Sequence, residues 1–349
     1  MVEGVVLHAG GTLQCSPSVH ADNRNSTVSN LPPPPQRIRA TLDSFPDRLI
    51  RASLSLQGDH QLDNLSTALG IIDTLLSSKP ISEFLANADP DLVEMIKTLD
   101  LPSRLTPETI ERGIQDVKWP GRLSFYLSHI PLHPVDNPTT TSSLLILADG
   151  AHNPASAHTL GAYISHLQFT TSAAGTPTTY ILALSHSPPK TPHDTLAPIL
   201  APVVSSSLSS SSSSLNSESA PPNLKPGIAL LPFTPPASMP WVRSVDPRVL
   251  RETVVQLFSD APPLEGEASL DITNKAEIRI FDNDTSVVNT SELTEGYSRP
   301  LVDAVRWAAA RHQATENLQS PRGLVVLAGS LYLVADLYQL LEGGFGSGS

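Results

Sequence analysis

The stretch from Asp149 to Pro154, Asp-Gly-Ala-His-Asn-Pro, places a carboxylate and an imidazole within one short turn. An apolar run that ends at Ala148 comes before it and is typical of a buried strand. Asn153 followed by Pro154 is a helix-start signal, with Asn as the cap and Pro at the first helical position. Asp149 and His152 therefore lie where a strand leads into a helix, the edge at which open α/β sheets bind ligands. Simple turn formation is the alternative role for both.

Two other segments contain polar residues suited to a nucleotide. His60, Gln61 and Asn64 can share one face at the start of a predicted helix, and such groups at a helix N-terminus can hold a base or a phosphate. In Trp119–Arg122, a Pro-Gly turn is followed by an arginine whose guanidinium suits a phosphate. Taken separately, each has a plainer interpretation, namely a capped and solvated helix start and a surface arginine.

A fourth segment, Leu327–Tyr338, places Gly329 and Ser330 between a predicted strand and a predicted helix, as a turn and a helix cap. Other chemistry is absent from the sequence: the patterns G-x-G-x-x-G, G-x-x-x-x-G-K-[ST], G-x-S-x-G and H-E-x-x-H do not occur. The eleven histidines show no metal-ligand spacing, so we expect no metal ligands. A lone histidine such as His20 or His312 is expected on the surface.

The composition indicates a protein of about two domains, at roughly 100–200 residues each. With 22 basic and 34 acidic residues, the net charge of −12 argues against a nucleic-acid or anionic-membrane partner. The single cysteine, Cys15, excludes an internal disulfide and fits a reducing compartment. No apolar run approaches the ~20 residues of a membrane span. We therefore expect a cytoplasmic location, with the mitochondrion as the alternative.

The pattern of elements changes along the chain. Between Arg51 and Val117 one strand, Arg51–Gln57, precedes helices predicted at Gln61–Leu76, Ile81–Asn87, Asp91–Leu99 and from Thr106 to about Val117. Further strands are predicted at Arg122–Ser128, Leu144–Ala148, Thr179–Leu184, Ile228–Leu231, Glu277–Phe281 and Leu324–Ala328. Further helices are predicted at Pro154–Leu167, Asp194–Leu200, Pro247–Phe258, Pro300–His312 and Leu331–Leu341.

This alternation predicts an α/β fold, with a mostly parallel, doubly wound sheet and helices on both faces. The serine-rich segment Ser205–Ser219 cannot bury enough apolar surface to become ordered, so a disordered insertion is expected near residues 204–224.

In this order, the four segments resemble the folylpolyglutamate synthase and dihydrofolate synthase family of the Mur ligase superfamily. The matching patterns are L-x-G-x-H-Q-x-x-N-x-x-x-A, G-I-x-x-V-x-W-P-G-R, D-G-A-H-N-P and G-S-L-Y-L-V, and Met239–Val242 is a further landmark. The resemblance runs from about Leu54 to Leu341. It implies a remnant of a central ATP-binding domain at 1–118, a Rossmann-like Mur-ligase C-terminal domain at 119–342, and a flexible tail at 343–349.

The resemblance also implies an ATP-dependent acid–amino-acid ligase that joins L-glutamate to dihydropteroate or a folate through an acyl phosphate. ATP and Mg²⁺ are the implied cofactors, the substrates are small molecules, and we expect a monomer. By motif match, Asn64, Arg122 and Asp149 would contact ATP. His152 would be the catalytic residue, in a cleft between domains. The same cleft would contain the substrate-side residues His60, Gln61 and Ser156.

The sequence departs from the family pattern in two respects. The P-loop and the residues that hold magnesium in the family have no counterpart here, and Lys190 and Asp194 are separated by Thr-Pro-His where the family has a Lys-Asp pair. We therefore expect the chain to be truncated and inactive alone. Asn153 and the Ser- and Pro-rich insertions favour a fungal dihydrofolate synthase. A folylpolyglutamate synthase and a non-catalytic binding protein derived from the ligase are the alternatives.

Overall fold

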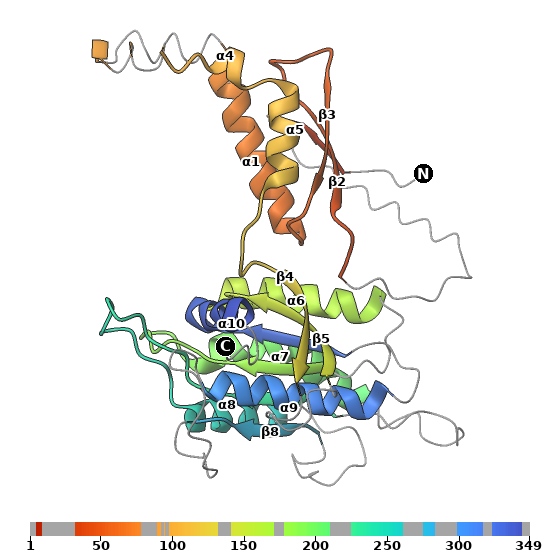
Figure 1. The fold of residues 1–349 in the computed structure, drawn as a ribbon, viewed down its shortest axis with the longest axis vertical. Helices are drawn as coiled ribbons and strands as arrows, with labels where there is room; N and C mark the ends of the chain where they lie inside the picture. The colour runs from red at the N-terminus through yellow and green to blue at the C-terminus, as the bar shows by residue number, and fades with distance from the viewer. Residues whose placement is uncertain are drawn as a thin grey trace, which may run out of the picture. The chain divides into compact units, whose positions relative to one another are not determined.

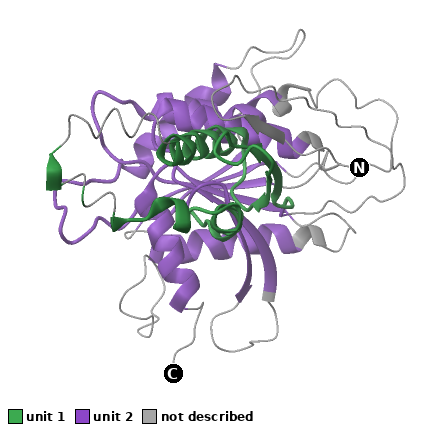
Figure 2. Ribbon diagram, turned by 90° about the horizontal axis from the view of Figure 1, so that it is seen from above, with its two compact units in different colours: residues 1–28, 33–120 green, residues 29–32, 121–349 purple. Residues whose placement is uncertain are grey.

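The computed structural model describes residues 5–8, 32–77, 89–91, 94, 98–131, 141–170, 178–209, 225–260, 275–282, 299–316 and 323–343. The helix predicted at 81–87, most of that at 91–99, His20, Cys15 and the tail beyond residue 343 lie outside these ranges. The chain divides into two compact units, residues 1–28 with 33–120 and residues 29–32 with 121–349 (Figure 2).

Unit 1 combines a small sheet with helices. Its elements are β1 (Val5–His8), β2 (Gln36–Thr41), β3 (Leu49–Leu54), α1 (Asp59–Leu76), α4 (Leu101–Arg104) and α5 (Pro107–Asp116). The strand order is β1-β2-β3, with β1 parallel and β3 antiparallel to β2. The apolar core lies between the sheet and the two long helices, with Ile50 of β3, Leu62 of α1 and Ile110 of α5 all buried. The predicted strand and both long helices in this part of the chain are confirmed, within a few residues at their ends.

Unit 2 is a layered α/β structure. Its elements are β4 (Ser124–Pro131), β5 (Thr141–Asp149), α6 (Pro154–Thr170), β6 (Thr178–Leu182), α7 (Pro192–Ser209), β7 (Gly227–Leu230), α8 (Pro247–Ser259), β8 (Glu277–Ile280), α9 (Arg299–Glu316), β9 (Leu324–Ala328) and α10 (Leu331–Gly343). The sheet order is β4-β5-β9-β6-β7-β8, and every pairing is parallel except that of β4 with β5.

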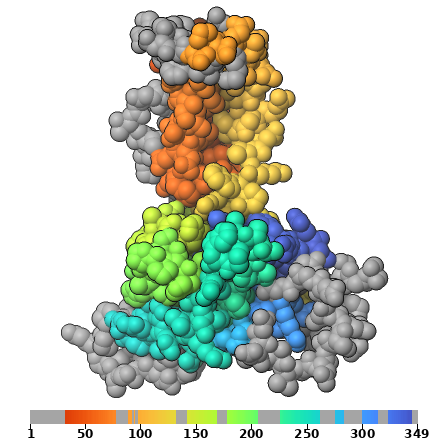
Figure 3. Space-filling model, turned by 90° about the vertical axis from the view of Figure 1, so that its left-hand side faces the viewer, coloured from red at the N-terminus to blue at the C-terminus, as the bar shows by residue number. Residues whose placement is uncertain are grey.

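Helices cover both faces of this sheet (Figure 1). The apolar faces of α6, α7 and α8 form one core with the sheet, and those of α9 and α10 form a second core on the opposite face. Figure 3 shows α6, α7 and α8 side by side, in yellow-green, green and teal. The predicted α/β fold, with a mostly parallel sheet and helices on both faces, is confirmed.

The last strand along the chain, β9, lies between β5 and β6 in the middle of the sheet. The helices that follow β5 and β6 pack on one face, whereas α10, which follows β9, packs on the other. The connections therefore diverge on both sides of β9. Such divergence opens a crevice at the carboxyl ends of parallel strands.

Two expectations need correction. Helix α7 continues to Ser209, so the start of the serine-rich segment is helical, because Ile199, Leu200 and Val203 anchor the preceding turns in the core. Residues 210–219 lie outside the described ranges. His312 is buried, with 2 % of its surface exposed, because α9 lays it against the first residues of β6 and against Gly323.

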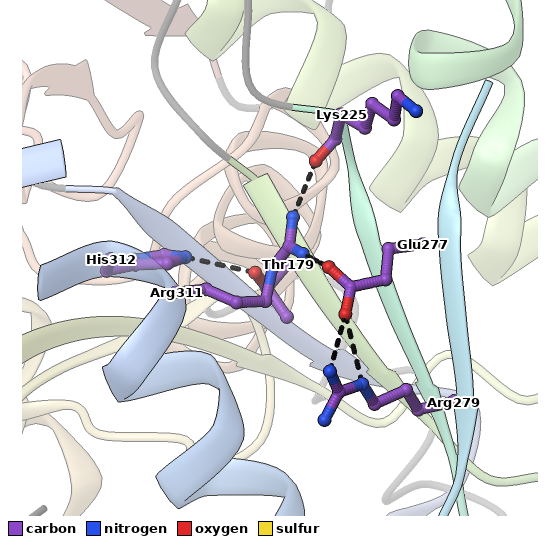
Figure 4. Close-up of polar contacts among 6 residues, drawn as sticks. All are labelled: Thr179, Lys225, Glu277, Arg279, Arg311 and His312. Atoms are coloured by element: carbon purple, nitrogen blue, oxygen red, sulfur yellow. Dashed lines mark hydrogen bonds and ion pairs between the residues drawn. The ribbon is translucent and has the colours of Figure 1, made fainter. Parts of the chain in front are cut away.

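His312 belongs to a polar cluster at the amino ends of β6, β7 and β8 (Figure 4). Its Nε2 lies 3.0 Å from Oγ1 of Thr179. The neighbouring Arg311 donates to the carboxylate of Glu277 and, at 2.6 Å, to the carbonyl of Lys225. Burial lowers the pKa of His312 to about 4, and the positive charge of Arg311 acts in the same direction. The cluster lies at the edge of the sheet opposite to the motif residues.

Candidate functional site

Three of the four motif segments meet at the carboxyl edge of the unit 2 sheet. Residues 121–123 lead into β4, residues 149–153 join β5 to α6, and residues 329–334 join β9 to α10. The backbone N–H of Gly150 donates to the carbonyl of Gly121 at 2.8 Å. A Cβ at Gly150 would come within 2.1 Å of Leu331, and one at Gly121 within 2.9 Å of Val334. A side chain at Gly150 would therefore have to displace Leu331, and Gly121 is favoured in addition by its φ of 75°.

Asp149 holds two of these segments together. Its Oδ2 accepts the backbone N–H of Leu123 at 2.8 Å, and its Oδ1 accepts that of Ala151, also at 2.8 Å. The residue is 6 % exposed. Of the two roles considered for Asp149, ATP contact and turn formation, the structure shows the second. Asp149 is therefore part of the packed interior, because β4 and α10 cover the end of β5.

Asn153 caps helix α6. Its Oδ1 accepts the backbone N–H of Ser156 at 3.0 Å, and the Ser156 Oγ accepts the N–H groups of His152 and Asn153 at 3.2 and 3.3 Å. The predicted cap and helix start are therefore observed. This arrangement engages the hydroxyl of Ser156, which the motif match had placed beside the substrate.

His152 is exposed at the start of this helix. Its Nδ1 lies 2.7 Å from the carbonyl oxygen of Gly150. Since a carbonyl can only accept, Nδ1 carries the hydrogen, and Nε2 has the free lone pair in the neutral ring. The turn thus presents a basic nitrogen to solvent.

Arg122 lies in a turn of unusual backbone shape. Gly121 has φ 75° and Leu123 has φ 43°, so residues in the left-handed region flank the arginine on both sides. Arg122 is half-buried, and its guanidinium has no hydrogen-bond or ion-pair partner within the part of the chain that the structure describes. A guanidinium of this kind suits a phosphate or a carboxylate.

The polar side chains predicted in unit 1 contact one another in series at the start of α1. Asn64 donates from Nδ2 to Oε1 of Gln61 at 3.1 Å, and Nε2 of Gln61 lies 3.1 Å from Nε2 of His60. Gln61 is buried, His60 is half-buried and Asn64 is exposed. The helical spacing therefore brings the three together, as predicted.

Three further residues singled out in the sequence have local roles. Ser330 caps α10, with its Oγ accepting the N–H of Tyr332 at 3.2 Å. Gly329, with φ 103°, lets the turn after β9 pass close to the carbonyl of Ala183 at the end of β6. Asp194 accepts the N–H and hydroxyl of Thr191, which caps α7.

Sequence reasoning missed Ser124, Tyr126 and Tyr338. The Ser124 Oγ accepts the N–H groups of Gly121 and Arg122 at 3.1 and 3.3 Å. The hydroxyls of Tyr126 and Tyr338 lie 2.6 Å apart, and that of Tyr338 also hydrogen-bonds with Ser124 and with the Gly121 backbone. For Ser124 and Tyr126 the available signal was polar residues at alternate positions of a strand, which is too common to single them out, and Tyr338 lies on helix α10.

In the described ranges, no three His, Cys, Asp or Glu side chains come together as a metal site requires. The residues of the edge therefore do not fit a magnesium ion by themselves, and we assign no metal ligand. None of the helices in these ranges has the length and hydropathy that a membrane span needs.

Comparisons with known proteins identify relatives of unit 2. Residues 132–208 match the family model described as dihydrofolate synthetase, C-terminal domain. No curated protein matches the sequence.

Solved structures are similar to the chain at low identity. They include a Mycobacterium tuberculosis folylpolyglutamate synthase complexed with ADP, 15% identical, covering 86% of this chain and 44% of that one, with a TM-score of 0.43. Another is a bifunctional folylpolyglutamate synthase/dihydrofolate synthase from Yersinia pestis, complexed with AMPPNP and Mn ion. It is 17% identical, the match covers 68% of this chain and 35% of that one, and the TM-score is 0.34. A Thermotoga maritima folylpolyglutamate synthase is 15% identical, with a match that covers 85% of this chain and 42% of that one and a TM-score of 0.38. The chain spans less than half the length of these structures.

The family match lies in the unit where three of the motif segments meet. Residues 132–208 thus match the family model of the dihydrofolate synthetase C-terminal domain, which confirms the resemblance to folylpolyglutamate and dihydrofolate synthases that the motifs indicated.

Proposed function

We propose that this chain is part of an ATP-dependent ligase that joins the amine of L-glutamate to the carboxylate of dihydropteroate, as a dihydrofolate synthase does. The proposal rests on one observation above all. Three motif segments meet at the carboxyl edge of the unit 2 sheet, and residues 132–208 of the same unit match the family model of the dihydrofolate synthetase C-terminal domain. The single cysteine agrees with a reducing compartment such as the cytoplasm.

The candidate residues suit different roles in the reaction because their side chains differ in chemistry. The guanidinium of Arg122, which has no partner in the described ranges, would bind phosphate oxygens of the nucleotide or of the acyl phosphate. His152 has a basic Nε2 exposed to solvent. In unit 1, the exposed amide of Asn64 would contact the nucleotide.

The reaction requires a proton acceptor. The nitrogen of glutamate attacks the carbonyl carbon of the acyl phosphate, the new C–N bond forms, and the bond from that carbon to the phosphate oxygen breaks. A proton must leave the amine, and Nε2 of His152 can accept it because Nδ1 already carries a hydrogen. Arg122 would stabilise the charge on the departing phosphate.

Nucleotide binding by the purified chain tests this proposal. A charge-assisted hydrogen bond contributes about 1.5–3 kcal/mol, so Arg122→Ala should weaken ADP binding roughly 10–100-fold by calorimetric titration. Arg251→Ala, which changes an exposed arginine on α8, serves as the matched control and should bind ADP like the wild type. Equal affinity in the Arg122→Ala and wild-type chains would show that this edge does not hold the nucleotide.

Ligase activity is a separate measurement. We expect the 349-residue chain by itself to form no ADP from ATP with glutamate and dihydropteroate, because the sequence has no P-loop pattern to hold the triphosphate. Glutamate-dependent ADP formation would contradict this expectation. Its dependence on dihydropteroate or on tetrahydrofolate would then decide between the two synthase activities.

A further inference from the structure

The backbone of the Gly121–Leu123 turn has hydrogen-bond partners at every N–H. Those of Gly121 and Arg122 donate to the Ser124 Oγ, and that of Leu123 donates to Oδ2 of Asp149. The carbonyl of Gly121 accepts from Gly150. Four hydrogen bonds therefore hold three residues, although a surface turn of this length could use water instead.

This turn has a backbone shape that needs such support. Leu123 has φ 43°, which lies in the left-handed region that is unfavourable for a residue with a Cβ. Strain of this kind persists only where the surroundings determine the conformation, and it gathers at ligand sites. Here Leu123 is itself buried, and Asp149 binds its N–H.

A second layer supports Ser124. The Tyr338 hydroxyl, on α10, hydrogen-bonds with the Ser124 side chain and the Gly121 backbone, and it lies 2.6 Å from the Tyr126 hydroxyl on β4. The two rings meet edge to face with centroids 5.4 Å apart. Burial raises the pKa of Tyr338 and keeps its hydroxyl neutral. The support therefore comes from two elements far apart in the sequence.

With these contacts made, the guanidinium of Arg122 still has no hydrogen-bond or ion-pair partner among the residues that the structure describes. We propose that Ser124 and Asp149 are positioning residues that hold this turn through its backbone, with Tyr338 supporting Ser124, so that Arg122 points its side chain at an anionic ligand. For the identity of that ligand, a nucleotide phosphate, the inference rests on the proposed function. Asp149 acts on this turn through the backbone N–H of Leu123.

Amide hydrogen exchange of the full chain tests the positioning without any ligand. Ser124→Ala removes the acceptor of two N–H groups, so exchange at Gly121 and Arg122 should become roughly three- to tenfold faster. Tyr338→Phe should have a smaller effect in the same place. Ser124→Thr, which keeps the hydroxyl, should restore slow exchange.

Tyr332→Phe is the matched control. It also removes a hydroxyl from α10, but this hydroxyl contacts Met239 and not the turn. It should leave exchange at the turn unchanged. The positioning role is wrong if Ser124→Ala does not accelerate exchange at Gly121 and Arg122. It is also wrong if exchange accelerates equally throughout β5 and β9, because that result would show a general loss of stability.

Titration with ADP then connects the turn to Arg122. Ser124→Ala should weaken ADP binding about three- to tenfold in the wild-type background and not at all in the Arg122→Ala background, because Ser124 acts only through the arginine. Equal weakening in both backgrounds would overturn the inference. If Arg122→Ala alone binds ADP like the wild type, the proposed function fails, whereas the exchange experiment still tests the positioning role without a ligand.

Discussion

Single residues in this protein owe their roles to neighbours distant in the sequence. Asp149 looked like a ligand-binding carboxylate, yet it accepts two backbone N–H groups and is buried. His312 looked like a surface residue, yet it is enclosed at the amino end of β6. In both cases the residue type is compatible with several roles, and the burial of the side chain decides among them.

The burial of Asp149 predicts a difference in stability between two variants of the same edge. Asp149→Ala leaves the N–H groups of Leu123 and Ala151 without their acceptor and should cost about 2–4 kcal/mol of the free energy of unfolding. Arg122→Ala removes a side chain without such contacts and should change that free energy by less than ~0.5 kcal/mol. Urea unfolding of the two variants measures both quantities. Equal stability would contradict the structural role of Asp149.

The burial of His312 predicts a loss of stability in mild acid. Burial, and then the charge of Arg311, lower its pKa in the folded protein from 6.5 to about 4. The unfolded chain therefore binds a proton between these two pH values that the folded protein does not bind. Stability should fall as the pH falls from about 6.5 to about 4, by on the order of 2–3 kcal/mol from this residue.

The measurement for this prediction is the free energy of unfolding of wild type and His312→Gln as a function of pH. The difference between the two curves isolates the contribution of His312 from that of the other histidines. The difference should change between pH 7 and pH 4.5, in favour of the variant in acid. A difference that is constant over this range would show that the His312 ring binds protons equally in the folded and unfolded states.

Secondary-structure elements follow local signals closely. Helices α5, α6, α7 and α8 each begin with a capping side chain directly before a proline, at Thr106, Asn153, Thr191 and Asp246 respectively. The packing of these helices depends on less visible features. In α7, Pro202 has no N–H to donate to the carbonyl of Pro198, four residues earlier. Gly161 of α6 lies against that carbonyl.

This close approach predicts opposite effects for two glycine substitutions within helices. A Cβ at Gly161 would lie 2.1 Å from the Pro198 oxygen, so Gly161→Ala must push α6 and α7 apart and should cost about 1–3 kcal/mol. At Gly70 of α1, a Cβ meets nothing within 4 Å, and Gly70→Ala should stabilise by about 0.5–1 kcal/mol. Thermal unfolding of the two variants measures whether each is less or more stable than the wild type. A Gly161→Ala variant as stable as the wild type would show that the contact is loose.

At the scale of the whole molecule, the chain has two sets of apolar cores. One cluster lies entirely within residues 38–117, and the other two lie entirely within residues 123–341. Each set is enclosed by elements of its own unit. A domain with its own core can fold by itself.

The separate cores predict that unit 2 folds without unit 1. A fragment of residues 121–349 should unfold cooperatively in urea, with its tryptophan fluorescence and far-ultraviolet circular dichroism changing at the same midpoint. In the full chain the same transition should persist at nearly the same urea concentration. A fragment that shows no cooperative transition would contradict the independence of the two cores.

The sequence by itself determined where most elements of unit 2 begin and end, because periodicity, capping and proline act within a few residues. It also determined that Gly150, Asn153 and Pro154 form a strand-to-helix turn. Only the tertiary structure placed β9 between β5 and β6, and only it brought Leu123 to Asp149, 26 residues further along. Strand order and the burial of a polar side chain depend on contacts between distant segments, which local patterns do not encode.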